Sequence, residues 1–168
     1  MQRSFTKRMS VAAAVALMAA VVVSADTAIA ASFHIDFAPG TACTFGLAVD
    51  GVGGDHRNVR TFVDANGNPV RTLDAGRGFQ LTFTNANTRR TLALPASGAV
   101  SRTVINADGS QTVTLTGNNV LFLFPTDVPA GPSTTLYVGQ VVFTIGVDQV
   151  FTLVSSSGTK TDICAALA

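Results

Sequence analysis

The two histidines of this chain and the aspartates near them are its most chemically versatile residues. His34 stands two positions before Asp36, so on a β-strand both side chains would lie on the same face. His56 follows Asp55 in the glycine-rich stretch DGVGGDHRN, which begins with Asp50. Imidazole and carboxylate groups are metal ligands and general bases. A loop folded back onto the strand would form a metal-assisted hydrolase site from His34 and His56; otherwise these are polar positions that face water.

A second stretch, VDANGNP, carries oxygen ligands at the spacing of a calcium-binding loop. Asp64, Asn66 and Asn68 match the first three ligand positions. The match then ends, because Pro69 stands where the sharp-turn glycine belongs and Ala75 replaces the bidentate glutamate. We therefore predict a hairpin turn here rather than a metal site.

No other group of reactive residues predicts a mechanism. The chain contains no G-x-S-x-G motif, and the serines of SSSG are predicted to lie in a turn. The acidic residues are all aspartates, with no identifiable pair for general acid and base work. We expect no catalytic residue, no metal ligand and no cofactor, and hence no enzyme.

The first thirty residues have the pattern of a signal peptide. Basic residues stand within the first eight positions, an apolar run covers Val11–Val23, and a small-x-small pattern ends at Ala30. We predict cleavage between Ala30 and Ala31. A membrane span needs about 20 apolar residues, and this run is shorter. The mature protein, residues 31–168, is expected to be secreted and not to span a membrane.

The chain has two cysteines, Cys43 and Cys164. Export leads to an oxidising environment, where two cysteines usually form one bridge. We predict a Cys43–Cys164 disulfide that ties the last strand to one of the first; the alternative is two free thiols.

Composition limits the class of partner and of fold. After position 30 the chain has eight basic and nine acidic residues, for a net charge near −1, so no nucleic acid is expected to bind. This region has no Glu and a single Lys but many Thr and Val residues, which favours β-structure.

Alternation of apolar and polar residues recurs along the mature chain. It is clear at 33–37, 79–83 and 112–116, and each stretch predicts a half-buried strand. Asn66-Gly67 and Asp108-Gly109 predict tight hairpins, and Ser157-Gly158 predicts a further turn. No helical period persists. About ten short strands predict a single all-β domain, a two-sheet antiparallel β-sandwich, with a closed or partly open β-barrel as the alternative.

Two segments are more apolar than a half-buried strand requires. Val120–Phe124 is apolar on both faces, and Val138–Val147 is apolar on one face and partly on the other. Each is either a central strand covered on both sides or an exposed surface that meets a partner. A cavity lined by Phe122, Phe124 and Phe143 is a further alternative.

Four features together resemble a group of small secreted all-β proteins of actinobacteria with no assigned activity. They are Cys43 followed by Thr44 and Phe45, the stretch LTGNNVLFLF, an apolar strand around Val141–Ile145, and the ending DICAALA. The resemblance implies export, the bridge and a β fold, and it transfers no catalytic residue.

The leading hypothesis from the sequence is a secreted, non-enzymatic β-sandwich that acts through its surface on an unknown protein or envelope component. The first alternative is a binder of an apolar small molecule in the phenylalanine-lined cavity. The second is the metal-assisted hydrolase that uses His34 and His56.

Overall fold

The computed structural model describes residues 32–54 and 56–168. The predicted signal peptide, its cleavage point and Asp55 lie outside them. The described residues form ten strands and one short helix: β1 (Ser32–Phe37), β2 (Leu47–Gly53), β3 (Arg57–Val63), β4 (Pro69–Arg77), β5 (Phe79–Asn85), β6 (Thr91–Leu94), β7 (Gly98–Ile105), β8 (Gln111–Leu123), β9 (Ser133–Ile145), β10 (Phe151–Asp162) and α1 (Ile163–Leu167). Within this part of the chain, no helix has the length and apolar character needed to cross a bilayer.

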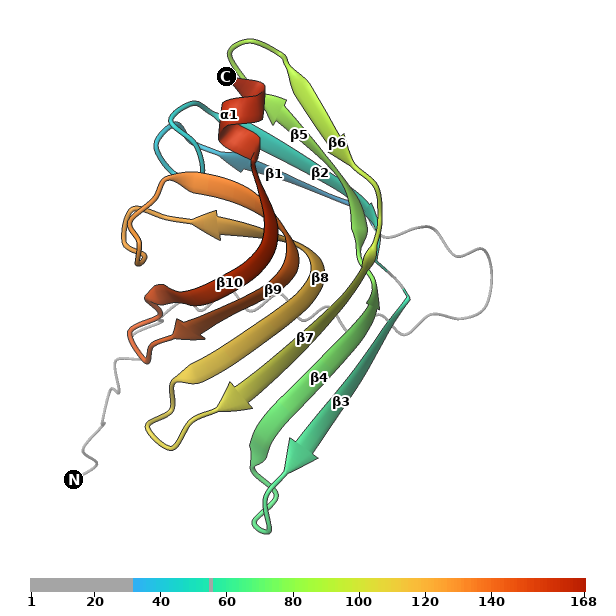
Figure 1. Cartoon of the computed structure of the whole chain (residues 1–168), viewed down its shortest axis with the longest axis vertical. Helices are drawn as coiled ribbons and strands as arrows, with labels where there is room; N and C mark the ends of the chain where they lie inside the picture. Colours follow the sequence, from blue (N-terminus) through green and yellow to red (C-terminus); the bar gives the residue numbers. More distant parts are fainter. Residues whose placement is uncertain (1–31, 55) are drawn as a thin grey trace, which may run out of the picture.

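The strands form two antiparallel sheets (Figure 1). The smaller sheet has the order β1-β2-β5-β6, and the larger has the order β10-β9-β8-β7-β4-β3. The predicted two-sheet antiparallel sandwich is therefore confirmed. The sheets do not close into one cylinder, so the closed-barrel alternative is wrong.

Both predicted hairpins are present. The Asn66-Gly67 turn joins β3 to β4, and the Asp108-Gly109 turn joins β7 to β8. In the first turn the Asp64 carboxylate accepts hydrogen bonds from the backbone amides of Asn66 at 2.8 Å and Asn68 at 2.9 Å. The stretch that resembles a calcium loop uses its carboxylate to close a turn, as predicted.

The turn predicted at Ser157-Gly158 is wrong. Both residues lie within β10, where Gly158 pairs with Gly139 of β9. Gly139 in turn pairs with Gly117 of β8, so three glycines stand in one row across the sheet. The glycine signal at Gly158 therefore marks a bend within a strand rather than the end of one.

The glycine row is the place where the larger sheet bends. Gly139 has a φ of 142°, and a Cβ atom there would lie 2.4 Å from the carbonyl oxygen of Ser157. Only glycine fits such a close approach of two backbones. Figure 1 shows β8, β9 and β10 curving sharply between their two ends. As a result, the far halves of β8 and β9 pack against the smaller sheet through Val120, Phe122 and Leu136.

The chain crosses directly between the two sheets at two points, from β4 to β5 and from β6 back to β7. β4 is followed by β5 after Gly78 alone, and β6 is followed by β7 after residues 95–97. The Gly78 amide donates a hydrogen bond to the Ser97 carbonyl at 2.9 Å, which holds the two crossings together. The sheets are thus joined on this side, and beyond the glycine row β8 and β9 leave β7 and lie against the smaller sheet (Figure 1).

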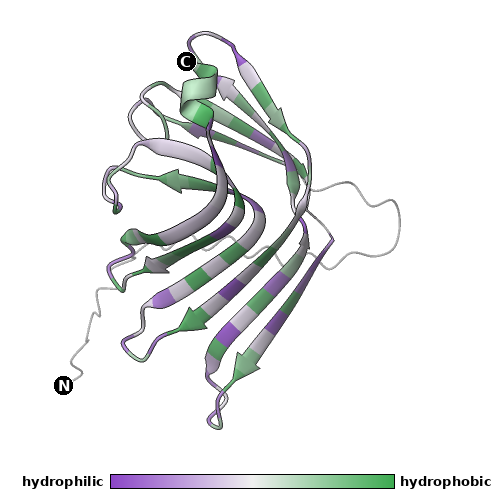
Figure 2. Cartoon of the chain, viewed as in Figure 1, coloured by the Kyte–Doolittle hydropathy of each residue, from purple (hydrophilic) through white to green (hydrophobic). Residues whose placement is uncertain are grey.

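The structure has two clusters of buried apolar side chains. One lies between the sheets and includes Leu47, Val49, Phe83, Ile163 and Leu167. The other joins alternate positions of β8 and β9 on either side of the glycine row, namely Val113, Leu121, Tyr137, Val141 and Phe143. Figure 2 shows the corresponding alternation of apolar and polar positions along the strands.

Val120–Phe124 was predicted to be a central strand or an exposed surface. Val120 and Phe122 pack against the cluster between the sheets, and Leu121 belongs to the second cluster. Both faces are therefore covered. However, residues 118–123 pair with β9 and with no other described strand, so this half of β8 is an edge rather than a centre.

Candidate functional site

A cavity of about 460 Å³ lies between the two sheets. Its walls come from both sheets and from the two crossings at Gly78 and Ser97. Small-molecule sites usually fall between about 300 and 1,000 Å³, so the space suits a small ligand.

Most of the wall is apolar. Phe33 and Phe79 meet edge to face with ring centroids 5.0 Å apart and close one side. Other apolar side chains continue the wall on both sheets: Ile35, Val49, Leu81, Leu94, Val120, Phe122 and Leu136.

The open edge of β8 forms another part of the wall. Three consecutive residues, Asn118, Asn119 and Val120, line the cavity. Consecutive residues of a strand point to opposite faces, so they contact one space only where that space lies along the strand edge. An edge strand directs backbone N–H and C=O groups away from its neighbour. The cavity therefore has a polar border beside its apolar walls.

Arg57 is the charged residue that lines the cavity among the described residues. Its Nε donates to both carboxylate oxygens of Asp74, at 2.9 and 3.0 Å, and its Nη2 lies 2.7 Å from Oδ2. Both side chains are 28% exposed. The pair uses Nε and Nη2 and leaves Nη1 for another acceptor.

Asn119 carries an unsatisfied donor. Its Nδ2 is buried and, among the described residues, is the only buried side-chain nitrogen or oxygen without a hydrogen-bond partner. Such groups are rare because an unpaired buried amide loses its bonds to water without replacement. Because this atom has almost no accessible surface, it does not face the cavity, and Asn119 borders the cavity through its backbone rather than through this donor.

The cavity agrees only in part with the sequence hypothesis. Phe122 lines it, whereas Phe124 and Phe143 are not among the lining residues. Phe124 is 36% exposed, and Phe143 stacks on Phe151 at 3.9 Å in the second cluster. Phe33 and Phe79 were missed because nothing in the sequence shows that their strands face β8.

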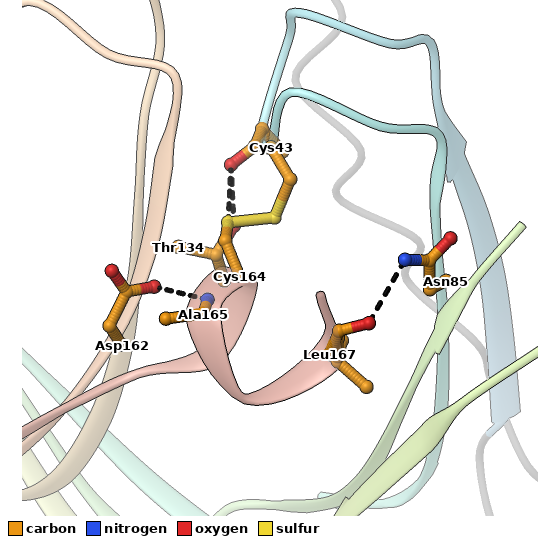
Figure 3. The surroundings of a disulfide bond; sticks show 8 residues. Cys43, Asn85, Thr134, Asp162, Cys164, Ala165 and Leu167 are labelled. Carbon is orange, nitrogen blue, oxygen red and sulfur yellow. Dashed lines mark hydrogen bonds between the residues drawn. A yellow bond between two sulfur atoms is a disulfide. The ribbon is translucent and has the colours of Figure 1, made fainter. Parts of the chain in front are cut away.

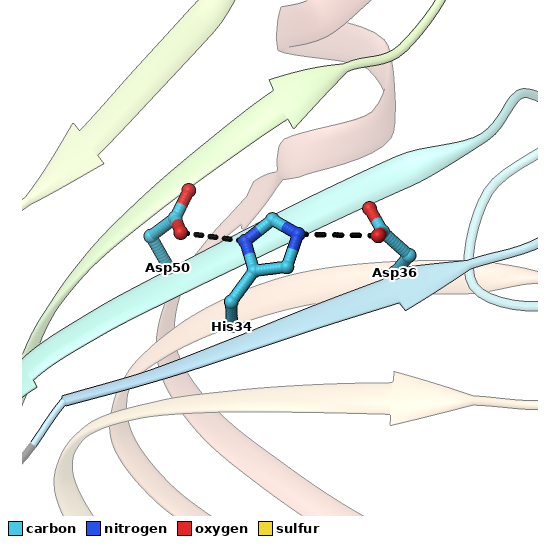
Figure 4. A network of polar contacts seen from close by, with 3 residues as sticks. All are labelled: His34, Asp36 and Asp50. Atoms are coloured by element: carbon cyan, nitrogen blue, oxygen red, sulfur yellow. Dashed lines mark hydrogen bonds and ion pairs between the residues drawn. The ribbon is translucent and has the colours of Figure 1, made fainter.

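His34 and Asp36 lie on one face of β1, as predicted; they also contact each other, and Asp50 is the second partner of the imidazole (Figure 4). His34 Nδ1 lies 2.6 Å from Asp50 of β2, and its Nε2 lies 3.1 Å from Asp36. Hydrogen bonds to Asp50 and then to Asp36 raise the pKa of His34 above 6.5, because both carboxylates favour the imidazolium. Phe33 and Ile35 line the cavity, so His34 between them points to the outer face of the sheet.

The side chains of His34, Asp36 and Asp50 do not converge on one point where a metal ion could bind. The two nitrogens lie on opposite sides of the ring, and each faces a different carboxylate (Figure 4). Within residues 32–54 and 56–168, no group of three or more His, Cys, Asp or Glu side chains has the arrangement of a metal site. Asp55 lies outside those residues, and His56 directly precedes β3 in the other sheet. The hydrolase hypothesis stays a prediction without a cluster to support it.

The predicted disulfide between Cys43 and Cys164 is confirmed (Figure 3). The Cα atoms are 5.6 Å apart, and Cys43 is fully buried. One detail of the prediction is wrong, because Cys164 lies in α1 rather than in the last strand, and Cys43 lies in the connection between β1 and β2. The bridge fastens the short helix over the end of the sandwich.

Polar contacts help to hold α1 in this place (Figure 3). The Asp162 carboxylate accepts a hydrogen bond from the amide of Ala165 at 2.9 Å and caps the helix. Asn85 Nδ2 donates to the Leu167 carbonyl at 3.0 Å. Together with the buried Ile163 and Leu167, these contacts close the end of the core between the sheets.

Comparison of the chain with known protein families, with curated proteins and with solved structures finds no match. The functional argument therefore depends on the cavity and its walls.

Proposed function

We propose that this protein is a non-enzymatic binder of an apolar small molecule, which it holds in the cavity between its sheets. The single observation that carries the proposal is a mostly apolar cavity of about 460 Å³ between the two sheets. Small-molecule sites are typically concave spaces of this size with mainly apolar walls. An apolar ligand would supply the contacts that the facing side chains of β5, β8 and β9 lack.

Rigid elements support the site. The disulfide and α1 hold one end of the sandwich, and the bend at the glycine row holds the far half of β8 apart from β6 and β7. A preformed cavity binds a ligand with a smaller cost of ordering. Export, as the sequence pattern of residues 1–30 predicts, belongs to this proposal: the protein would meet its ligand outside the cytoplasm.

The surface hypothesis is the second candidate. The β3–β4 hairpin carries exposed apolar side chains, with Val59 61% and Val63 58% exposed. Phe62 of the same strand is 38% exposed and lies under the guanidinium of Arg71 at 4.0 Å. Pull-down of envelope components with the mature protein and with a Val59→Ser, Val63→Ser variant tests this role. Equal recovery by both proteins would exclude the hairpin as the contact.

Titration with N-phenyl-1-naphthylamine, a neutral apolar dye that fluoresces out of water, tests the cavity. We expect saturable binding at one site per chain. Leu81→Trp, which fills the cavity, should abolish the signal. Val154→Trp is the matched control, because Val154 is 59% exposed and does not line the cavity. No binding to the folded wild-type protein, or equal binding to the Leu81→Trp variant, would exclude the proposal.

A further inference from the structure

Arginine side chains lie close together on one face of the larger sheet. Arg60 lies opposite Leu73 in the β3–β4 ladder, and Leu73 lies opposite Arg102 in the β4–β7 ladder. Arg71 precedes Leu73 by two positions on β4, so its side chain shares that face. Neighbouring strands are about 4.8 Å apart and alternate residues of a strand about 7 Å apart, so the Cα atoms of these arginines lie within about 10 Å of one another. We refer to Arg60, Arg71 and Arg102 as the arginine cluster.

No carboxylate of the described residues neutralises the arginine cluster. β3, β4 and β7 contain one acidic residue, Asp74, which pairs with Arg57 on the opposite face. Asp64 at the hairpin tip accepts hydrogen bonds from the amides of its own turn. The ion pairs between described residues involve His34 and Arg57 and none of the clustered arginines. Like charges at this spacing repel one another, so the face attracts a negatively charged partner.

The same face also presents apolar side chains. Phe62, Arg71 and Val104 lie in one row across β3, β4 and β7, next to the row that contains Leu73. Phe62 is 38% exposed, and the guanidinium of Arg71 lies 4.0 Å from the centroid of its ring. On these strands every member of both rows is half-buried or exposed, so no other layer of the described structure covers the face. A broad basic surface with interleaved apolar side chains fits the headgroup region of a bilayer, where both kinds of side chain find partners.

From these observations we infer that this face of the larger sheet docks on an anionic lipid bilayer. The arginine cluster contacts the lipid phosphates, and the Phe62 ring enters the headgroup region. A second copy of the chain fits this face poorly, because it would bring a second arginine cluster against the first. A small soluble anion would leave Phe62 in water, and the arginine cluster lines no part of the cavity that could enclose one. The docking face is separate from that cavity, so this inference stands or falls independently of the proposed function.

Flotation of the protein over a range of vesicle concentrations tests this docking. One set of vesicles contains phosphatidylcholine alone, and the other contains phosphatidylcholine and phosphatidylglycerol in equal amounts. Each surface arginine contributes about fivefold to the affinity for an anionic bilayer, so the wild type should prefer the mixed vesicles by about 100-fold. The Arg60→Gln, Arg102→Gln variant should bind the mixed vesicles about 30-fold more weakly. Binding that is equal for the two sets, or absent from both, would overturn the inference.

The Arg89→Gln, Lys160→Gln variant is the matched control, because it removes the same charge from exposed residues outside the cluster. An equal loss of binding in both double variants would show that net charge attracts the bilayer and would overturn the assignment to this face. Phe62→Ser should weaken binding to the mixed vesicles about 3- to 10-fold, because the ring no longer buries apolar area. No change would overturn its insertion.

Soluble polyglutamate separates a bilayer from an acidic polymer. Binding of polyglutamate, with no binding of the mixed vesicles, would overturn the inference and assign the face to a polymer. The comparison of the two vesicle sets uses the wild type alone, so it decides even if a variant does not fold.

Discussion

Cys43 and Cys164 are bonded to each other although 121 positions separate them in the sequence. By the chain-entropy relation, closure of such a loop stabilises the folded state by about 4 to 5 kcal/mol. The Cys43→Ala, Cys164→Ala variant should lose about that free energy of unfolding in urea. Reductant should lower the urea midpoint of the wild type and leave that of the variant unchanged. A wild-type midpoint that does not respond to reductant after complete thiol release would contradict this account of the bridge.

Two asparagines give opposite predictions for the same substitution. Asn119 has a buried donor without a partner, so Asn119→Leu should raise the free energy of unfolding of the ligand-free protein by about 1 kcal/mol. Asn85 is 2% exposed and donates to the Leu167 carbonyl. Asn85→Leu should therefore lower stability by about 2 kcal/mol or more. Urea unfolding of both variants measures the two effects. A loss of stability at Asn119 would show that its amide is already satisfied in the protein.

Local sequence patterns predicted most of the strands. Alternation at 33–37 and 112–116 corresponds to β1 and to the first half of β8. The turn chemistry of Asn66 and Asp108 placed both hairpins correctly. These signals succeed because each depends on neighbours within a few positions.

Contacts that depend on strand register were not predictable in the same way. The position of His34 and Asp36 on one face follows from their spacing on a single strand. The hydrogen bond between His34 and Asp50 instead depends on register, because Asp50 lies opposite His34 in the β1–β2 ladder. Arg57 and Asn119 reach one cavity through an order of strands that no local pattern specifies. The bend was missed because alternation continues through Gly139, and a glycine within a strand predicts a turn as readily as a bend.

The bend can be tested at Gly139. An alanine there needs a strained φ of 142° and places its Cβ 2.4 Å from the Ser157 carbonyl oxygen. Gly139→Ala should destabilise the fold by at least about 1 to 3 kcal/mol. Gly98→Ala is the control, because a Cβ at Gly98 meets nothing within 4 Å. This variant should change stability by less than about 1 kcal/mol. Thermal unfolding of the two variants compares them, and equal stability would show that the row tolerates side chains.

The His34 trio predicts a pH dependence of the β1–β2 pair. The folded-state pKa of His34 lies above the ordinary value of 6.5, chiefly because of its hydrogen bond to Asp50 and then of that to Asp36. A group with a raised folded pKa stabilises the fold below the unfolded pKa and loses this contribution as pH rises through the folded value. The wild type should therefore gain stability over His34→Gln at about pH 5 and lose the difference at about pH 8. NMR titration of the imidazole measures the pKa directly. Asp50→Asn should lower it more than Asp36→Asn does, and a wild-type value at or below 6.5 would contradict the ion pairs.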